Sequence, residues 1–179
     1  MNSTYNRAQE LEESGDLAAA SVQYTVAALS KLNETDFEPS TGYRIALSTL
    51  LQAISAAARA GNTNRSIAVR EIATALITHA INADSDIDPV LKGLYYEWIG
   101  DAYLLTDSEH AERYYRKAAA QYEQTSIESY LSWSMEQEFD YIYWTVQSYL
   151  DQRDSTFNEE LPILDFQSRV KRKRDEVDD

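Results

Sequence analysis

The sequence predicts an all-α protein, because it is poor in turn-forming residues and its apolar residues follow a helical spacing. Only 5 of its 179 residues are Gly and only 3 are Pro, whereas strand-rich folds need many turns that use both. Apolar residues recur at three- and four-residue intervals, which is the spacing of one face of a helix. The length suits one domain with a sizeable core. We therefore expect a succession of helices.

The first predicted helix pair lies within about residues 3–32. A helix over about 3–14 ends at Gly15, because Gly readily adopts the left-handed conformation that ends helices. Asp16 is placed to cap a second helix over about 17–32, and its side chain would accept a hydrogen bond from the first turn.

Four further helices are predicted before residue 124. A connector over 33–42 leads into a helix over about 42–60, which Gly61-Asn62 stops, and another follows over about 63–82. Pro89 suits the first turn of the fifth helix. The fifth and sixth helices include the aromatic stretch 95–123, and a seventh runs from about Ser126 to about residue 151.

Two stretches of the chain align as copies of one helix pair. Ala8 aligns with Gly100, and Asp16 aligns with Asp107. The second helices align through small and aromatic residues, namely Ala20, Tyr24 and Ala27 in the first copy and Ala111, Tyr115 and Ala118 in the last. A weaker copy lies between them, and Ala68, Ile72 and Ala75 fit its second helix if its turn is about two residues longer.

This pattern resembles the tetratricopeptide repeat family, whose unit is a helix–turn–helix of about 34 residues. The best copy carries the family landmarks Tyr96, Ile99, Gly100 and Tyr103, followed by those of its second helix. Thr4 and Arg7 depart from the pattern in the first copy. The resemblance implies an α-α superhelix of about three antiparallel helix pairs plus a C-terminal capping helix over 1–151, followed by a polar tail over 152–179.

The resemblance also implies a partner-binding groove, which in that family is lined by the first helix of each pair and commonly binds an extended peptide. The matching positions here are Tyr5, Gln9, Glu12, Leu51, Ser55, Glu97, Asp101 and Leu104. Trp98 is a further candidate, because the repeat does not require it. The family's basic clamp for terminal carboxylates is not reproduced, since Asn6 lacks the lysine or arginine that would accompany it.

The predicted helix 126–151 is aromatic nearly all round and acidic. Its bulky rings exceed what one apolar stripe needs, and the candidates for partner contact are Tyr130, Trp133, Tyr141 and Trp144. Three readings stay open: the tail covers these rings, a subunit or partner covers them, or they line a small-ligand pocket. The basic tail residues Arg169, Lys171, Arg172, Lys173 and Arg174 are complementary in charge to this helix and could dock on it.

The sequence offers little for catalysis. It has no cysteine, which excludes thiolate chemistry and disulfides, and its two histidines lie in different predicted helix pairs. Gly-rich phosphate loops, nucleophile elbows and zinc motifs are absent from the sequence. We therefore expect a protein that is not an enzyme and has no cofactor or metal.

The charge balance limits the partners. The chain has 16 basic and 30 acidic residues, a net charge of −14, and nucleic-acid binding needs basic surface. The composition, with few lysines and many acidic residues, resembles that of proteins from salt-loving archaea. The N-terminus does not resemble a signal peptide, and no segment is apolar for long enough to span a membrane, so we expect a cytoplasmic protein without membrane insertion.

These observations favour a non-catalytic adaptor or scaffold that binds a protein or peptide through its groove or its aromatic acidic face. The alternative is a self-assembling structural or accessory protein that forms a homodimer through the aromatic helix 126–151. An enzyme or ligand-sensing domain with a pocket between helices is a third reading.

Overall fold

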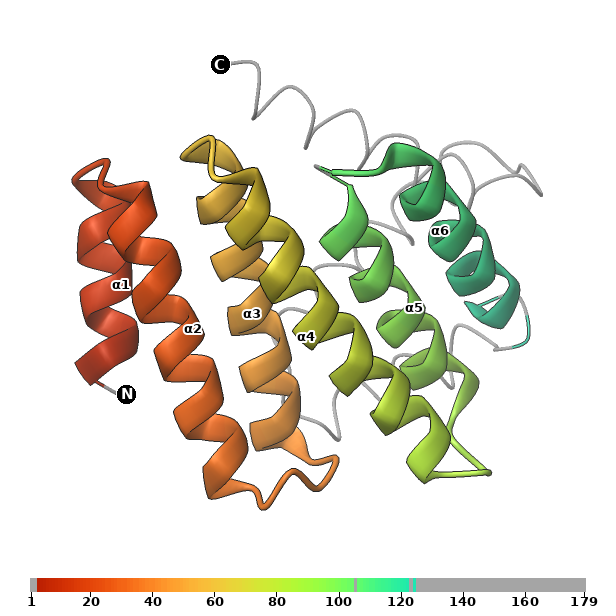
Figure 1. Ribbon diagram of the computed structural model, residues 1–179. Helices are drawn as coiled ribbons and strands as arrows, with labels where there is room; N and C mark the ends of the chain where they lie inside the picture. The colour runs from red at the N-terminus through yellow and green to blue at the C-terminus, as the bar shows by residue number, and fades with distance from the viewer. Residues whose placement is uncertain (1–2, 105, 123, 125–179) are drawn as a thin grey trace, which may run out of the picture.

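The computed structural model describes residues 3–104, 106–122 and 124, and these residues form an all-α fold (Figure 1). The helices in order are α1 (Ser3–Glu13), α2 (Leu17–Glu34), α3 (Thr41–Arg59), α4 (Thr63–Ala83), α5 (Pro89–Tyr103) and α6 (Ser108–Tyr122). Consecutive helices pack against each other as three hairpins, α1–α2, α3–α4 and α5–α6. The predicted all-α class is confirmed, whereas the predicted helix 126–151 and the tail 152–179 lie outside the described residues.

Side-chain caps determine where the second helix of each hairpin begins. Asp16 accepts a hydrogen bond from the Ala19 amide at 3.1 Å, and Asn62 accepts one from the Arg65 amide at 3.1 Å. Asp107 does the same for the His110 amide at 3.1 Å. Each cap satisfies an amide that has no partner within its own helix. The starts predicted at Asp16 and after Gly61-Asn62 are therefore confirmed.

The helices lie in two layers, which we call the odd layer (α1, α3 and α5) and the even layer (α2, α4 and α6). In the odd layer, Gln52 of α3 donates a hydrogen bond to the Tyr5 hydroxyl of α1 at 3.2 Å, and α3 also contacts α5. In the even layer, Arg65 of α4 donates to Ser21 and Thr25 of α2. The two layers face each other across the core (Figure 1).

The caps show that the hairpins repeat every 46 and then 45 residues, from Asp16 to Asn62 to Asp107. This period is longer than the roughly 34 residues that the tetratricopeptide resemblance implies. Helices of 18 and 21 residues in α2 and α4 account for part of the difference. The family resemblance itself stays a prediction.

The predicted register of α4 is wrong. Ile72 is 40% exposed, and Ala68 and Ala75 are also exposed. The buried residues are instead Ser66, Val69, Ala73, Ile77 and Ala80. Counted from the caps, Ser66, Arg70 and Ala73 occupy the places of Ala20, Tyr24 and Ala27, so the turn needs no extra residues.

A close approach holds the third hairpin together. A Cβ atom at Gly100 would lie 2.6 Å from Cε1 of Tyr115, which is closer than such atoms come in proteins. The Tyr115 ring is buried at 2% exposure, and its hydroxyl donates a hydrogen bond to Asp101 at 2.6 Å. The predicted pairing of a small residue on one helix with an aromatic ring on the next is therefore observed here.

Candidate functional site

The predicted groove residues of α1 mostly connect helices. The Tyr5 ring lies edge-on to the Tyr24 ring, with 5.7 Å between centroids. The Glu12 carboxylate accepts hydrogen bonds from the Tyr24 hydroxyl and from Arg59, both at 2.6 Å. Gln9 is exposed. Tyr5 and Glu12 therefore tie α1 to both neighbouring helices, and Gln9 is the candidate on α1 whose side chain is open to solvent.

Burial and this hydrogen bond affect the ionisation of Tyr24. Burial raises the pKa of Tyr24 well above its ordinary value, and its bond to the Glu12 carboxylate raises it further. Burial likewise raises the pKa of Tyr43 to about 12, and the Tyr43 hydroxyl donates to the Leu76 carbonyl at 2.7 Å. Both tyrosines are therefore neutral hydrogen-bond donors at physiological pH.

The predicted groove residues of α5 are mostly inaccessible. Glu97 and Trp98 are fully buried, and Leu104 is 5% exposed. Asp101 is partly buried and accepts the hydrogen bond from Tyr115. A partner could not reach Glu97, Trp98 or Leu104 in this arrangement. The physical reason is that α5 contacts α3, α4 and α6, so few of its positions remain open.

Trp98 belongs to the core between the layers. Its ring lies 5.9 Å from the Tyr95 ring in an edge-on arrangement, and both join the cluster that contains Leu47 and Ile77. Arg44 reaches the same region: burial raises the pKa of Tyr95, and the charge of Arg44 partly offsets that increase. Trp98, which the repeat pattern does not require, is therefore used in packing.

The outer face of α3 is an accessible part of the odd layer. Its side chains follow the helical spacing, namely Thr41, Ile45, Ser48, Gln52 and Ser55. Thr41, Ile45 and Gln52 are exposed, and Ser48 and Ser55 are partly exposed. We call these five residues the α3 row. Leu51, which was predicted beside Ser55, is half-buried and packs into the core.

The chemistry of the α3 row suits hydrogen bonding to a neutral polar chain. It offers hydroxyl groups and one amide, which both donate and accept hydrogen bonds, and one apolar side chain, Ile45 at 45% exposure. It contains no acid: residues 39–70 include four arginines and no Asp or Glu. The row is therefore free of acids in a chain whose net charge is −14.

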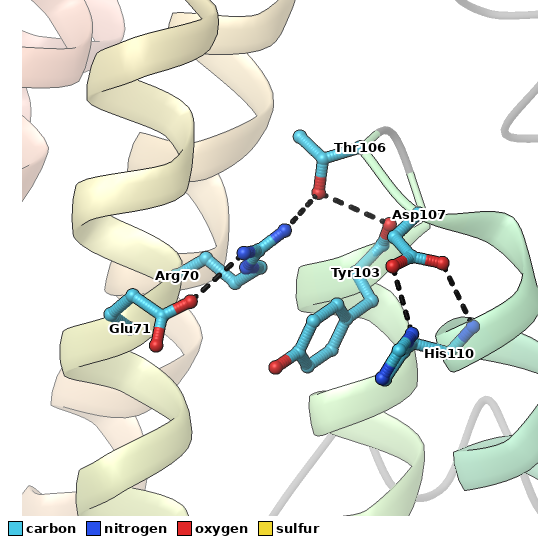
Figure 2. A network of polar contacts seen from close by, with 6 residues as sticks. All are labelled: Arg70, Glu71, Tyr103, Thr106, Asp107 and His110. Atoms are coloured by element: carbon cyan, nitrogen blue, oxygen red, sulfur yellow. Dashed lines mark hydrogen bonds and ion pairs between the residues drawn. The ribbon is translucent and has the colours of Figure 1, made fainter.

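A second polar arrangement links the second and third hairpins (Figure 2). The Arg70 guanidinium lies over the Tyr103 ring, 4.4 Å from its centroid, and donates to Thr106 Oγ1 at 2.7 Å. It also pairs with Glu71 at 2.8 Å. Arg70 stands where the other hairpins have Tyr24 and Tyr115, but it extends toward α5 and the turn that follows it.

The same arrangement continues onto α6 through stacked rings. Tyr103 stacks on His110 at 5.2 Å and on Tyr114 at 6.0 Å between centroids, and Lys117 lies 4.8 Å from the Tyr114 centroid. Asp107 pairs with His110 Nδ1 at 2.8 Å. The hydrogen bond from the His110 amide is the main cause that lowers the pKa of the Asp107 carboxyl.

Sequence reasoning missed Arg70 because it assigned the wrong register to α4. The signal was present in the cap: Asn62 followed by Ser66, Arg70 and Ala73 repeats the offsets of Asp16 followed by Ala20, Tyr24 and Ala27. The arrangement fixes the position of the third hairpin by packing and hydrogen bonding.

The remaining predicted site residues lie outside the described part of the chain. These are Tyr130, Trp133, Tyr141 and Trp144 of the predicted aromatic helix, and Arg169, Lys171, Arg172, Lys173 and Arg174 of the tail. Their predicted role in partner contact stays a prediction.

Within the described residues, no group of three or more His, Asp or Glu side chains is arranged to hold a metal ion. Among the helices that the structure describes, none has the length and apolar composition needed to cross a membrane. No family model, curated protein or solved structure matches the chain.

Proposed function

We propose that this chain is a non-catalytic adaptor that binds an extended segment of a partner protein along the α3 row. The observation that carries the proposal is the row itself: its hydroxyl and amide side chains are exposed or partly exposed at one helical face, with no acid among them. Such groups can pair with the N–H and C=O groups of a peptide backbone. The exposed Ile45 offers an apolar contact for one partner side chain.

The neighbouring residues favour a polypeptide that enters from the α1 side. Gln9 is exposed on α1, whereas the equivalent surface of α5 is closed by the burial of Glu97 and Leu104. A partner would therefore lie over α1 and α3. Asn6 and Gln9 add amides at that end.

The hydrogen bonds between α1 and α3 also support the adaptor proposal. Side-chain hydrogen bonds such as Arg59 to Glu12 and Gln52 to Tyr5 hold α1 and α3 in a fixed relation. A preorganised surface loses less freedom on binding, which increases affinity. The cytoplasmic location and the peptide partner belong to this proposal.

A matched pair of variants tests the proposal. Ile45→Arg places a bulky charge on the α3 row, and Ile67→Arg places the same charge on an exposed isoleucine of the even layer. The tagged chain is incubated in extract of the source organism at its native salt concentration, cross-linked and analysed by quantitative mass spectrometry. We expect a set of proteins that wild type and Ile67→Arg capture and that Ile45→Arg loses by about tenfold or more.

Equal capture by Ile45→Arg and wild type would refute binding at the α3 row. The same holds if no protein is enriched over an untagged control. Circular dichroism of both variants confirms that a loss of capture is not a loss of folding.

The alternative function, self-assembly through the aromatic helix 126–151, rests on residues outside the described part of the chain. It stays a prediction.

A further inference from the structure

The connection between α2 and α3 exposes an aromatic ring. We call residues 35–40 the Phe37 loop, and it lies at one end of the hairpin array, beyond the ends of α2 and α3 (Figure 1). Phe37 is 47% exposed and belongs to none of the core clusters. A phenylalanine ring offers a large apolar area for contact with another molecule. In this loop, about half of that area is open to solvent.

The backbone of the Phe37 loop has a conformation that phenylalanine rarely adopts. The φ angles of Asp36 and Phe37 are 50° and 60°, which lie in the left-handed region where a Cβ atom is crowded. The turns that follow α1 and α3 use Gly15 and Gly61 at positive φ instead. A bulky residue in this conformation lowers stability, and such strain is found most often at functional positions.

Hydrogen bonds and packing hold the Phe37 loop in place. The Phe37 amide donates to the Leu32 carbonyl at 3.2 Å, and the Glu38 amide donates to the Thr35 carbonyl at 2.9 Å. A Cβ atom at Gly42 would lie 2.8 Å from Cγ2 of Thr35, so the start of α3 packs closely against the loop. A ring on a fixed backbone loses little freedom on binding, which increases affinity.

The charges beside the ring are negative. Glu34, Asp36 and Glu38 are all exposed. Glu34 pairs with Lys31 at 2.7 Å, whereas Asp36 and Glu38 form no ion pair with any residue that the structure describes. The α4–α5 connection lies at the same end of the array (Figure 1) and adds the exposed acids Asp84, Asp86 and Asp88. The ring is therefore presented at an acidic end of the molecule.

We propose that the Phe37 loop docks on a partner protein, where the Phe37 ring fills an apolar pocket rimmed by lysine and arginine side chains. The ring supplies the apolar contact at the centre, where interfaces are enriched in aromatic residues. Asp36 and Glu38 lie next to it in the chain, so their carboxylates reach the rim of the same pocket. Complementary charge at the rim speeds association and selects against other partners.

The same acids argue against other occupants of this surface. A second copy of the chain brings a net charge of −14 and an identical acidic loop, so the two loops repel each other. A membrane surface with anionic lipids attracts basic segments and repels this one. A basic protein surface is the occupant whose charge fits.

Photo-cross-linking of the full-length chain tests the proposal. The photoreactive residue p-benzoylphenylalanine replaces Phe37, or replaces Val26 as a control, since Val26 is 48% exposed within the uncharged stretch 17–30. The chain is irradiated in extract of the source organism, and the cross-linked positions are mapped by mass spectrometry. We expect position 37, and not position 26, to mark one site on a partner protein, in an apolar pocket surrounded by lysine and arginine.

Neutral variants test the role of the acids. Glu34→Gln, Asp36→Asn and Glu38→Gln together should reduce cross-linking from position 37 by about tenfold or more. The control combines Glu10→Gln, Glu13→Gln and Glu109→Gln, which neutralises three other exposed acids and should leave the cross-linking yield within about twofold.

Phe37→Asn separates binding from folding, because asparagine adopts positive φ more readily than phenylalanine. Its unfolding temperature should not fall by more than about 3 °C, whereas its dissociation constant for the mapped partner, measured by calorimetry, should rise by about tenfold or more. Val26→Asn should leave that dissociation constant unchanged.

Four results would overturn the proposal. They are a larger fall in the unfolding temperature of Phe37→Asn, the absence of any partner cross-linked above the position 26 control, cross-links only to lipid or to this chain itself, and cross-linking that survives neutralisation of the loop. The Phe37 loop shares no residue with the α3 row, and the α3 row is tested by Ile45→Arg, so either proposal can fail without the other.

Discussion

Replacing Gly100 by Ala should destabilise the protein, although Ala usually favours a helix. Gly100 lies inside α5, where Ala would gain roughly 1 kcal/mol in helix propensity. The added methyl group would lie 2.6 Å from the Tyr115 ring, however, and overpacking of this kind costs about 1–3 kcal/mol. The ring cannot shift freely, because its hydroxyl bonds to Asp101, and disrupting a bond to a charged group costs about 1.5–3 kcal/mol.

The sum of these effects is a net loss of roughly 1.5–5 kcal/mol in the free energy of unfolding. Urea unfolding followed by far-ultraviolet circular dichroism measures it. The decisive comparison is the same substitution in a Tyr115→Ala background, where the ring is gone. There Gly100→Ala should be stabilising by roughly 1 kcal/mol, since only the helix propensity remains. If Gly100→Ala stabilises the protein in both backgrounds, the close approach of Gly100 and Tyr115 is refuted.

Three further predictions address the register, the caps and the pH dependence. Ala73→Leu should cost about 1–3 kcal/mol of unfolding free energy because Ala73 is fully buried. Ala75→Leu on the exposed side should change the unfolding free energy by less than about 0.5 kcal/mol. Equal effects of the two substitutions would contradict the register of α4. Asn62→Ala should cost about 1 kcal/mol through loss of the α4 cap, measured by the same urea titration, and an unchanged midpoint would argue against that cap. The raised pKa of Tyr43, about 12 against an ordinary value of 10.0, means that above pH 10.0 the unfolded state releases this proton first. Stability should therefore fall as pH rises between these two values. Tyr43→Phe should reduce that fall in urea titrations across the alkaline range, and an identical slope in both proteins would count against the burial of this hydroxyl.

Local chemistry was sufficient to predict where helices begin and end. Asp16 and Asn62 act within three residues along the chain, and Gly15 and Gly61 adopt positive φ at the preceding position. Pro89 begins α5 as expected. These features depend on the neighbouring residues alone, so a single sequence contains them.

The faces of α4 and α5 could not be predicted in the same way. In α4, the exposed set Ala68, Ile72 and Ala75 has as regular a helical spacing as the buried set around Ala73. In α5, apolar residues occupy most of the circumference. Periodicity identifies residues that share a side of a helix, but tertiary packing decides which side is covered.

The candidate site was likewise only partly predictable from the sequence. The resemblance to a repeat family suggested that the first helix of each hairpin faces a partner. Of the α3 positions that it named, Ser55 is partly exposed and Leu51 packs into the core. The resemblance could not show that Glu97 and Leu104 are covered.

The three hairpins are not interchangeable, and Arg70 is the reason. In the first and third hairpins, Tyr24 and Tyr115 bond to the preceding helix of their own hairpin. In the second hairpin, Arg70 bonds to Thr106 beyond α5 and lies on Tyr103. A chain rebuilt with its hairpins in another order would leave this guanidinium without its acceptor and Tyr103 without its cation. An additional hairpin inserted between α4 and α5 would break the bond from Arg70 to Thr106, and one inserted between α2 and α3 would break the bonds from Arg59 to Glu12 and from Arg65 to Ser21.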